Sequence, residues 1–301
     1  MTAPRILLIG RNGQVGWELR RALAPLGALR AVGRDELDLT DVRAIRALID
    51  KIRPDIVVNA AAYTAVDQAE KEEALAMTVN GEAPGAMAQA CHEHGALLVH
   101  YSTDYVFDGG KKGRWREDDA PAPLSAYGRS KLAGEKAVAA TGGSHLMLRV
   151  CWVYDRRGRN FLRTILRLAA ERETLDVVDD QFGAPTWSRM IAEATALMLA
   201  HLASRPGHWA EKAAAVSGIY HLPSQGETSW HGFARAIVAQ APKAAALRLR
   251  PEAIRAIPSS DYPTPARRPA NSLLDGSKFA TTFGLALPDW QEQLARCLEE
   301  M

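Results

Sequence analysis

The chain has 301 residues, of which 47% are hydrophobic and 24% charged, and its formal net charge is +2. This composition is that of a folded globular protein, and it excludes a disordered, collagen-like or coiled-coil chain. The near balance of charge offers no chain-wide attraction for nucleic acid or an anionic membrane. Three widely spaced cysteines form no Cys-x-x-Cys pair and the N-terminus has no signal-peptide pattern, so we expect a reduced, cytoplasmic setting with no membrane span.

The first 150 residues alternate short apolar runs with amphipathic stretches. The apolar runs predict strands at 5–9, 29–32, 55–58, 96–100 and 146–150. The stretches between them predict helices at 15–26, 41–52, 85–94 and 125–140. Strands that alternate with helices in this way predict an α/β fold with a Rossmann-type doubly wound parallel sheet, covered by helices on both faces.

Beyond residue 150 the alternation loosens, and loops rich in Pro, Gly and Arg join helical patterns at 161–172 and 190–203. We therefore expect one domain at 1–150, which holds the doubly wound sheet, and a smaller α/β lobe at 151–301. The apolar run at 219–222 is followed by a helical stretch after Ser229, which predicts that part of 216–241 rejoins the main sheet.

A glycine-rich turn follows the first expected strand and opens the first expected helix. Glycines there permit a tight turn and close approach to a pyrophosphate, while the helix N-terminus offers unpaired N–H groups. A turn that binds no ligand is the alternative, and the strand–turn–helix context disfavours it. The predicted cofactor-binding residues of this turn are Gly10, Arg11, Asn12, Gly13, Gln14, Val15 and Gly16.

The end of the second expected strand bears on the choice of cofactor. A carboxylate at this position would bind the ribose of NAD, but here Gly33 is followed by Arg34. Arg34, together with Arg11, could bind a 2′-phosphate, which favours NADPH, while Asp35 keeps NADH open. The alternative is two solvated surface arginines. Further along, Asp38 and Leu39 are expected on the adenine side of the cofactor.

Small residues follow the third expected strand, where the backbone can lie close against an extended ligand. We expect this segment to bind the cofactor as well, although a close helix–sheet contact would use the same residue types. The residues concerned are Ala60, Ala61, Ala62 and Tyr63.

A hydroxyl residue and a Tyr-x-x-x-Lys pair carry the expected chemistry. Tyr127 and Lys131 lie one helical turn apart on one face, and Thr103 follows closely after the fourth expected strand. A free tyrosine has a pKa near ~10, and a neighbouring ammonium would lower it toward the range useful for proton transfer. Lys131 could also bind the nicotinamide ribose, and Thr103 could donate to a substrate oxygen. A surface pair is the alternative, which the upstream hydroxyl and the glycine turn disfavour.

Together these motifs resemble the extended short-chain dehydrogenase/reductases, and within them the family of dTDP-4-dehydrorhamnose reductases. The resemblance spans nearly the whole chain and is most specific at 131–136, 180–186 and 262–269. It implies a dinucleotide-binding domain, a nucleotide-sugar-binding lobe and catalysis in the cleft between them. It further implies that NADPH reduces the 4-keto group of dTDP-4-dehydro-L-rhamnose to give dTDP-L-rhamnose. Tyr127 would then protonate the oxygen, with Thr103 orienting it and Lys131 holding the ribose.

The same resemblance supplies an expected substrate site. Trp152 would form an aromatic wall against the sugar, unless it is a core tryptophan at the domain junction. Arg267 or Arg268 would meet the diphosphate, unless both are structural ion-pair residues. The expected substrate-binding residues are Thr64, Val66, Thr103, Asp104, Tyr105, Tyr127, Trp152, Gln181, Arg267 and Arg268.

One departure concerns magnesium. Some members of the family are described as joining two subunits through Mg²⁺ held by glutamates, and Glu18 matches one of these. Arg189 stands where another carboxylate would be expected, and a cation there repels a divalent metal. We therefore expect no bound metal, and a monomer and a homodimer both remain open.

Other activities fit the same scaffold less well. A dehydratase typically has an Asp–Glu pair after the threonine, but Asp104 is followed by Tyr105. An epimerase could use the same tyrosine with an NAD⁺ that is never released. A non-catalytic, dinucleotide-binding regulatory subunit, like the methionine adenosyltransferase beta subunit, would not need the intact Thr103, Tyr127 and Lys131.

Overall fold

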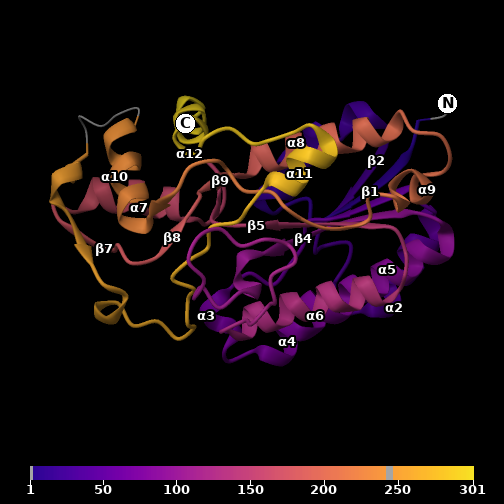
Figure 1. Cartoon of the computed structure of the whole chain (residues 1–301), viewed down its shortest axis with the longest axis horizontal. Coiled ribbons are helices and arrows are strands. Elements are labelled where there is room, and N and C mark those ends of the chain that lie inside the picture. The colour runs from indigo at the N-terminus through magenta and orange to yellow at the C-terminus, as the bar shows by residue number, and fades with distance from the viewer. Residues whose placement is uncertain (1–2, 242–246) are drawn as a thin grey trace.

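A six-stranded parallel sheet forms the centre of the computed structural model, which describes residues 3–241 and 247–301 (Figure 1). The strand order is β10-β5-β4-β3-β1-β2, and every neighbouring pair is parallel. This is the Rossmann-type sheet that the sequence predicts. The strands are β1 (Arg5–Ile9), β2 (Ala28–Val32), β3 (Ile56–Asn59), β4 (Leu97–Thr103), β5 (His145–Val150) and β10 (Gly218–His221).

Helices cover both faces of this sheet because its strands are apolar on both sides. Leu7, Val57 and Met147 pack on one face with α2 (Val42–Ile52) and α5 (Ala83–His94). The residues directly before and after these in each strand face the opposite side of the sheet, because successive side chains of a strand alternate between its two faces. These pack on the opposite face with α1 (Gln14–Ala22) and α8 (Ser188–Ala203).

Helix α6 (Ala126–Ala140) carries the Tyr-x-x-x-Lys pair and is fixed at its start. The Ser125 hydroxyl accepts a hydrogen bond from Gly128 N at 3.2 Å, which caps the first turn. Gly134 lies so close to Asn80 O that a Cβ would overlap it, so α6 packs tightly on the 78–82 segment. That segment is a short π-helix between α4 (Glu73–Met77) and α5.

A smaller lobe lies at one end of the sheet and is built from later parts of the chain (Figure 1). It contains α7 (Phe161–Glu171), α10 (Trp230–Gln240) and α12 (Trp290–Glu299). Strand β10 pairs with β5, so the chain returns from the lobe to the main sheet. Three two-stranded sheets complete the lobe: β6 (Val153–Tyr154) with β9 (Thr186–Trp187), β7 (Leu175–Val178) with β12 (Ile254–Ile257), and β8 (Phe182–Gly183) with β11 (Thr228–Ser229). The remaining helices are α3 (Val66–Ala69), α9 (Trp209–Ala214) and α11 (Ser277–Phe283).

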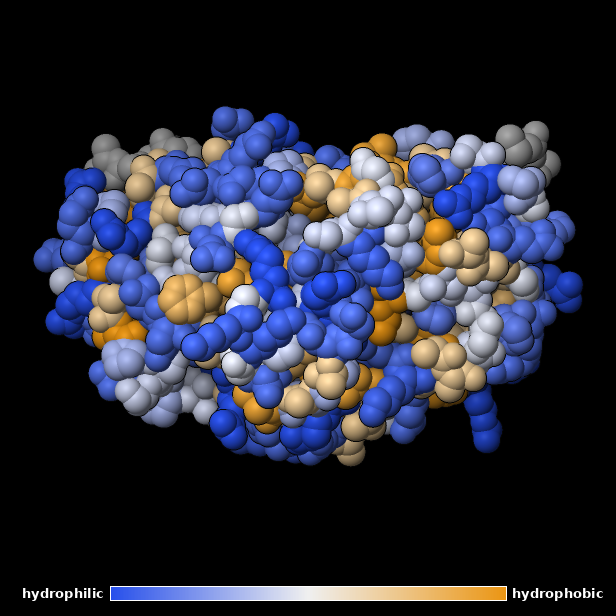
Figure 2. All heavy atoms as spheres, viewed as in Figure 1, coloured by the Kyte–Doolittle hydropathy of each residue, from blue (hydrophilic) through white to orange (hydrophobic). Residues whose placement is uncertain are grey.

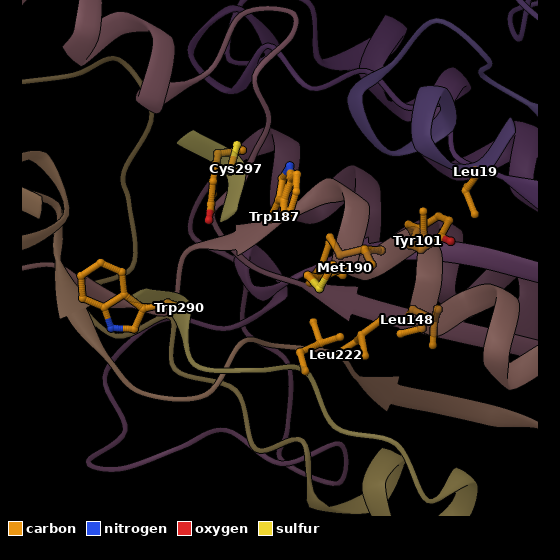
Figure 3. Packing of buried hydrophobic residues seen from close by; sticks show 14 of the residues in the cluster. Leu19, Tyr101, Leu148, Trp187, Met190, Leu222, Trp290 and Cys297 are labelled. Carbon is orange, nitrogen blue, oxygen red and sulfur yellow. The ribbon is translucent and has the colours of Figure 1, made fainter. Parts of the chain in front are cut away.

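One hydrophobic cluster runs from the sheet into the lobe. Leu19 and Tyr101 belong to the sheet and its covering helix, whereas Trp290 and Cys297 belong to the lobe, and all are buried (Figure 3). Met190 of α8 lies between the two groups (Figure 3). This shared core holds the two parts of the chain in a fixed relation, so a cleft between them has a defined shape.

The surface is mostly hydrophilic, with hydrophobic residues in small separate groups on the face that Figure 2 shows. Among the described residues, no helix combines the length and the apolar character that crossing a membrane requires.

Two of the predicted elements end at least three residues away from the predicted position, whereas the bounds of the others differ by two residues or fewer. The first helix was predicted over 15–26 but ends at Ala22, and residues 24–26 form a separate 3-10 turn. Pro25 lies in that turn and cannot donate the backbone hydrogen bond that a continuing α-helix needs. Strand β4 extends to Thr103 rather than ending at residue 100, because its last three residues pair with β5.

Candidate active site

A cleft of about 730 Å³ lies beyond the carboxyl ends of the central strands. Its walls come from the glycine turn, from the segments after β2, β3, β4 and β5, from α6, and from the lobe residues Gly158, Arg159, Asn160 and Trp230. Open α/β sheets bind ligands at this edge. The position of the cleft is therefore that of a cofactor and substrate site.

The glycines of the turn have distinct structural tasks. Gly10 has φ +94°, and a Cβ there would come within 2.7 Å of Ala61 N. Gly16 does not line the cleft, contrary to its predicted ligand contact; it packs against Gly10 O, where a Cβ would overlap the oxygen. Gly13 is exposed and lines the cleft, and a Cβ there would make only ordinary contacts, the nearest with Gly10 O at 3.5 Å. The turn thus leaves room for a pyrophosphate next to the start of α1.

The two arginines near the adenine end are in different environments. Arg11 is held by Asp35 at 2.6 Å and by Glu36, and it does not line the cleft, so its predicted contact with a 2′-phosphate is not supported. Its charge is already neutralised by these carboxylates. Arg34 is exposed and lines the cleft beside Asp38 and Leu39. A backbone hydrogen bond from Thr40 lowers the pKa of Asp38, so this carboxyl is ionised at neutral pH.

This difference predicts the effect of removing Arg34. We expect Arg34→Ala to weaken NADPH binding by about tenfold or more and to leave NADH binding nearly unchanged, because only NADPH carries the 2′-phosphate. Arg30→Ala removes an exposed arginine that pairs with Glu36 outside the cleft and serves as the control. Dissociation constants of both cofactors measure the effect, and equal losses for NADPH and NADH would contradict it.

The segment after β3 is clamped to helix α6. Asn80 Oδ1 accepts from Tyr63 N at 2.8 Å, and Asn80 Nδ2 donates to Tyr63 O at 2.9 Å and to Ser130 Oγ at 3.0 Å. The cleft is lined here by Ala60, Ala61, Ala62, Tyr63, Thr64 and Val66. This wall is therefore fixed relative to Tyr127 on the same helix.

Thr103, Tyr127 and Lys131 all line the cleft, the first at the end of β4 and the other two on α6. The predicted lowering of the tyrosine pKa by the lysine is wrong. Burial raises the pKa of Tyr127 to about 12, the Thr103 hydrogen bond opposes this, and the Asp104 charge adds to it. The phenol is therefore fully protonated at neutral pH, which is the state that a proton donor needs.

Lys131 is wholly buried and does not behave as an ordinary surface ammonium. Burial lowers its pKa to about 8, and the charge of Glu135 opposes the shift. Its Nζ donates to Tyr101 O at 2.6 Å. Both charge states of the lysine are consequently populated near neutral pH.

A buried carboxyl lies next to these groups. Burial raises the pKa of Asp104 to about 6, and Thr103 Oγ1 donates to Asp104 Oδ1 at 3.1 Å. Among the residues that the structure describes, the second oxygen, Oδ2, is buried without a hydrogen-bond partner. Tyr105 follows, with its ring edge-on to that of Tyr127 at 5.5 Å between centroids. Polar and aromatic groups thus surround the phenol on the substrate side.

Two stacked tryptophans form the lobe side of the cleft. Trp152 adopts φ +45° and stacks on Trp230, with 3.6 Å between ring centroids. Gly183 lies flat against the Trp152 ring, where no Cβ would fit. Four residues that line the cleft were not predicted from the sequence: Gly158, Arg159, Asn160 and Trp230. Asn160 Nδ2 donates to Gln14 Oε1 at 2.8 Å, which ties the lobe to the glycine turn.

Three predicted substrate-binding residues do not line the cleft. Gln181 Nε2 donates to Ser259 Oγ at 2.9 Å, and Arg267 is exposed away from the cleft-lining set. Arg268 pairs with Asp67 at 2.9 Å. Burial raises the pKa of the cleft residue Tyr105, and the charge of Arg268 opposes this shift. Gln181 and Arg268 are thus engaged in structural contacts, which was the alternative for Arg268.

Arg189 forms an ion pair with Glu18 at 3.2 Å and another with Glu300. Glu193 also lies near Arg189. Burial raises the pKa of the Glu193 carboxyl, and the charge of Arg189 opposes this shift without cancelling it. Within residues 3–241 and 247–301 no group of three metal-ligating side chains is placed to bind an ion. The arginine occupies the position between the carboxylates.

We therefore expect activity to survive EDTA, because Arg189 already supplies the positive charge that a cation would bring to Glu18 and Glu300. NADPH oxidation with the keto-sugar substrate, measured before and after prolonged treatment with chelator, tests this expectation. Activity that disappears with EDTA and returns with magnesium would contradict it.

The parallel sheet, the glycine turn at its edge and a protonated tyrosine beside a buried lysine define an NAD(P)-dependent oxidoreductase of the extended short-chain type. The family model described as the RmlD substrate binding domain matches residues 4–301. A dTDP-4-dehydrorhamnose reductase from Burkholderia thailandensis is 53% identical over 99% of this chain and 99% of its own. That of Escherichia coli K12 is 46% identical over 98% and 97%. The chain therefore belongs to the dTDP-4-dehydrorhamnose reductase family.

Solved structures agree with this assignment. The dTDP-4-dehydrorhamnose reductase of Bacillus anthracis in complex with NADP has a TM-score of 0.88 and 32% identity, with 100% of both chains covered. The UDP-glucose 4-epimerase of Thermus thermophilus, in complex with NAD, has a TM-score of 0.78 at 19% identity over 98% of both chains. The latter likeness shows a shared fold alone.

Proposed function

We propose that this protein reduces the 4-keto group of dTDP-4-dehydro-L-rhamnose with NADPH to give dTDP-L-rhamnose. The cleft supports this function because it joins a nucleotide cradle to a proton donor and an aromatic wall. Bound NADPH supplies the hydride. The observation that carries the proposal is the Tyr127 phenol, held protonated in the same cleft as the glycine turn.

The part of the cleft formed by the glycine turn and the segment after β3, which we call the cradle, fits a dinucleotide. Gly10 and Gly13 leave room beside the N-terminus of α1, and Ala60, Ala61 and Ala62 present small side chains to the same space. Arg34 is the cation positioned for a 2′-phosphate. The residues that would hold NADPH are Gly10, Asn12, Gly13, Gln14, Val15, Arg34, Asp38, Leu39, Ala60, Ala61, Ala62, Tyr63 and Lys131.

The proton comes from Tyr127. As hydride reaches carbon 4, negative charge develops on the carbonyl oxygen, and the phenol transfers its proton to that oxygen. The Thr103 hydroxyl lies beside Tyr127, and it would orient the same oxygen by turning its proton to that oxygen from Asp104 Oδ1. Lys131 holds the ribose and, in its charged form, stabilises the phenolate that remains after transfer.

The sugar nucleotide would lie between the two parts of the chain. Residues 1–150 would bind the cofactor, and the lobe built from parts of 151–301 would cover the sugar, with Trp152 and Trp230 as its apolar wall. Within that range, strand β10 belongs to the main sheet instead, and helix α8 packs on it. Thr64, Val66, Asp104 and Tyr105 complete the substrate side. Arg159 is the exposed lobe cation in the cleft and is positioned to meet the diphosphate.

The stoichiometry of cofactor use tests this function. With dTDP-4-dehydro-L-rhamnose and NADPH, we expect one NADP⁺ to be released for each dTDP-L-rhamnose formed. An epimerase would interconvert sugars without net release of oxidised cofactor, and a regulatory subunit would bind NADPH without oxidising it. Either of these results would overturn the proposal.

A further inference from the structure

His100 is wholly buried on β4, between two nitrogen groups that both approach its ring. Its Nδ1 lies 3.1 Å from Asn59 Nδ2 on β3, and its Nε2 lies 3.3 Å from Lys131 Nζ on α6. Burial lowers the pKa of His100 well below its ordinary value, and the charges of Lys131 and His145 add to this. The ring is therefore neutral, with one N–H and one lone pair to divide between two partners.

The Asn59 amide determines which ring nitrogen carries the proton. Ala61 N donates to Asn59 Oδ1 at 3.1 Å, which fixes the orientation of the amide. Its NH₂ group consequently faces His100 Nδ1 and donates to it. Nδ1 must then be the acceptor, so the proton lies on Nε2 and points at Lys131 Nζ.

This arrangement suits only one charge state of the lysine. A neutral amine has a lone pair that can accept from the His100 Nε2–H, whereas an ammonium has three donors and no acceptor. Lys131 Nζ can still donate to Tyr101 O in either state. When Lys131 is an ammonium, His100 Nε2 must accept, so the ring proton moves to Nδ1. The Asn59 amide must then turn so that its Oδ1 accepts from Nδ1–H, and this oxygen no longer accepts from Ala61 N.

We propose that His100 is a positioning residue that couples the charge of Lys131 to the Asn59–Ala61 turn lining the cofactor cleft. Its effect on catalysis rests on the proposed role of Lys131, but the coupling itself does not. Glu135, one turn further along α6, favours the ammonium and so opposes His100, while the Tyr127 phenol is neutral. Charging Lys131 thus disturbs the backbone N–H that lies next to Gly10 in the cradle.

The histidine tautomer can be observed directly in the unaltered protein. In [¹⁵N]histidine-labelled protein titrated from pH 6 to 9.5, nitrogen shifts distinguish Nε2–H, Nδ1–H and imidazolium, and His100→Leu assigns the signal. We expect Nε2–H at high pH and Nδ1–H at low pH, with the midpoint at the titration of Lys131. One tautomer throughout, or an imidazolium, would overturn the proposal.

The lysine can be followed in the same range with [¹³Cε]lysine, assigned by comparison with Lys131→Arg. We expect His100→Leu to raise the midpoint of Lys131 by about one pH unit, roughly tenfold in proton affinity, because the opposing N–H is gone. Asn59→Asp should also raise it, since two carboxylate oxygens accept from Ala61 N and from Nδ1–H together.

His221→Leu is the matched control, because it removes another wholly buried histidine that contacts Arg149 and Trp115 rather than Lys131. We expect it to leave the Lys131 midpoint unchanged. A midpoint in His100→Leu that is unchanged or lower than in the wild type would overturn the coupling. Neither titration uses sugar or turnover, so the function could fail while this inference stands, and the reverse also holds.

Discussion

Replacing Tyr127 with phenylalanine should lower kcat for NADPH-dependent reduction by at least about a hundredfold, the lower end of what a positioned general acid contributes. The variant keeps the ring that packs edge-on against Tyr105 and loses only the hydroxyl. Because the phenol is protonated at neutral pH, its removal leaves the developing oxyanion without a proton donor. Single-turnover rates and the dissociation constant of NADPH would separate this loss from a loss of cofactor binding.

Tyr154→Phe is the appropriate control. Tyr154 is also a buried tyrosine, but its hydroxyl finds no hydrogen-bond partner in the described part of the chain and does not line the cleft. We expect its turnover to match the wild type. Unchanged kcat in Tyr127→Phe would remove the phenol from the reaction, and equal losses in both variants would point to a general effect of losing a buried hydroxyl.

The second large effect concerns stability. Arg149 and Glu135 form an ion pair at 2.6 Å beneath the active site, and both are almost fully buried. Glu135 Oε1 also accepts from Arg149 Nε at 2.8 Å and from the Ser102 hydroxyl. We expect Arg149→Met to lower the free energy of unfolding by about 3–5 kcal/mol, because the Glu135 carboxylate then remains buried without its counter-charge.

Replacing both partners tests the reason for that loss. In Glu135→Leu/Arg149→Met no charge is left uncompensated, so we expect the double variant to be clearly more stable than Arg149→Met alone. Urea denaturation of the three proteins measures this. If the double variant is as unstable as the single one, the cost lies in packing around Phe107, over which the guanidinium stacks, rather than in the charge.

The alternation of apolar runs and helical stretches predicted the parallel sheet because its strands are buried on both faces and therefore carry a strong local signal. The Tyr127–Lys131 pair could be found for a similar reason, since one helix brings both onto one face. By contrast, Trp230 lies 78 residues after its stacking partner Trp152, and no local pattern links them.

The incorrect predictions share a physical cause. Whether a cation is free or paired depends on carboxylates placed by the fold, as Asp35 and Glu36 are for Arg11 and Asp67 is for Arg268. The pKa of Tyr127 likewise depends on burial, and it rises although a lysine stands four residues away. Desolvation and ion pairing are tertiary quantities that the order of residues does not reveal.

The most direct test of the whole account is to follow the hydride. With NADPH deuterated on the transferable position of the nicotinamide ring, mass and NMR spectra of the sugar product should show one deuterium, bonded to carbon 4 of the rhamnose. Deuterium at that carbon, together with its loss from the cofactor, is the result that we predict. A rhamnose product without deuterium, or a cofactor that keeps its label while the sugar changes, would contradict direct reduction in this cleft.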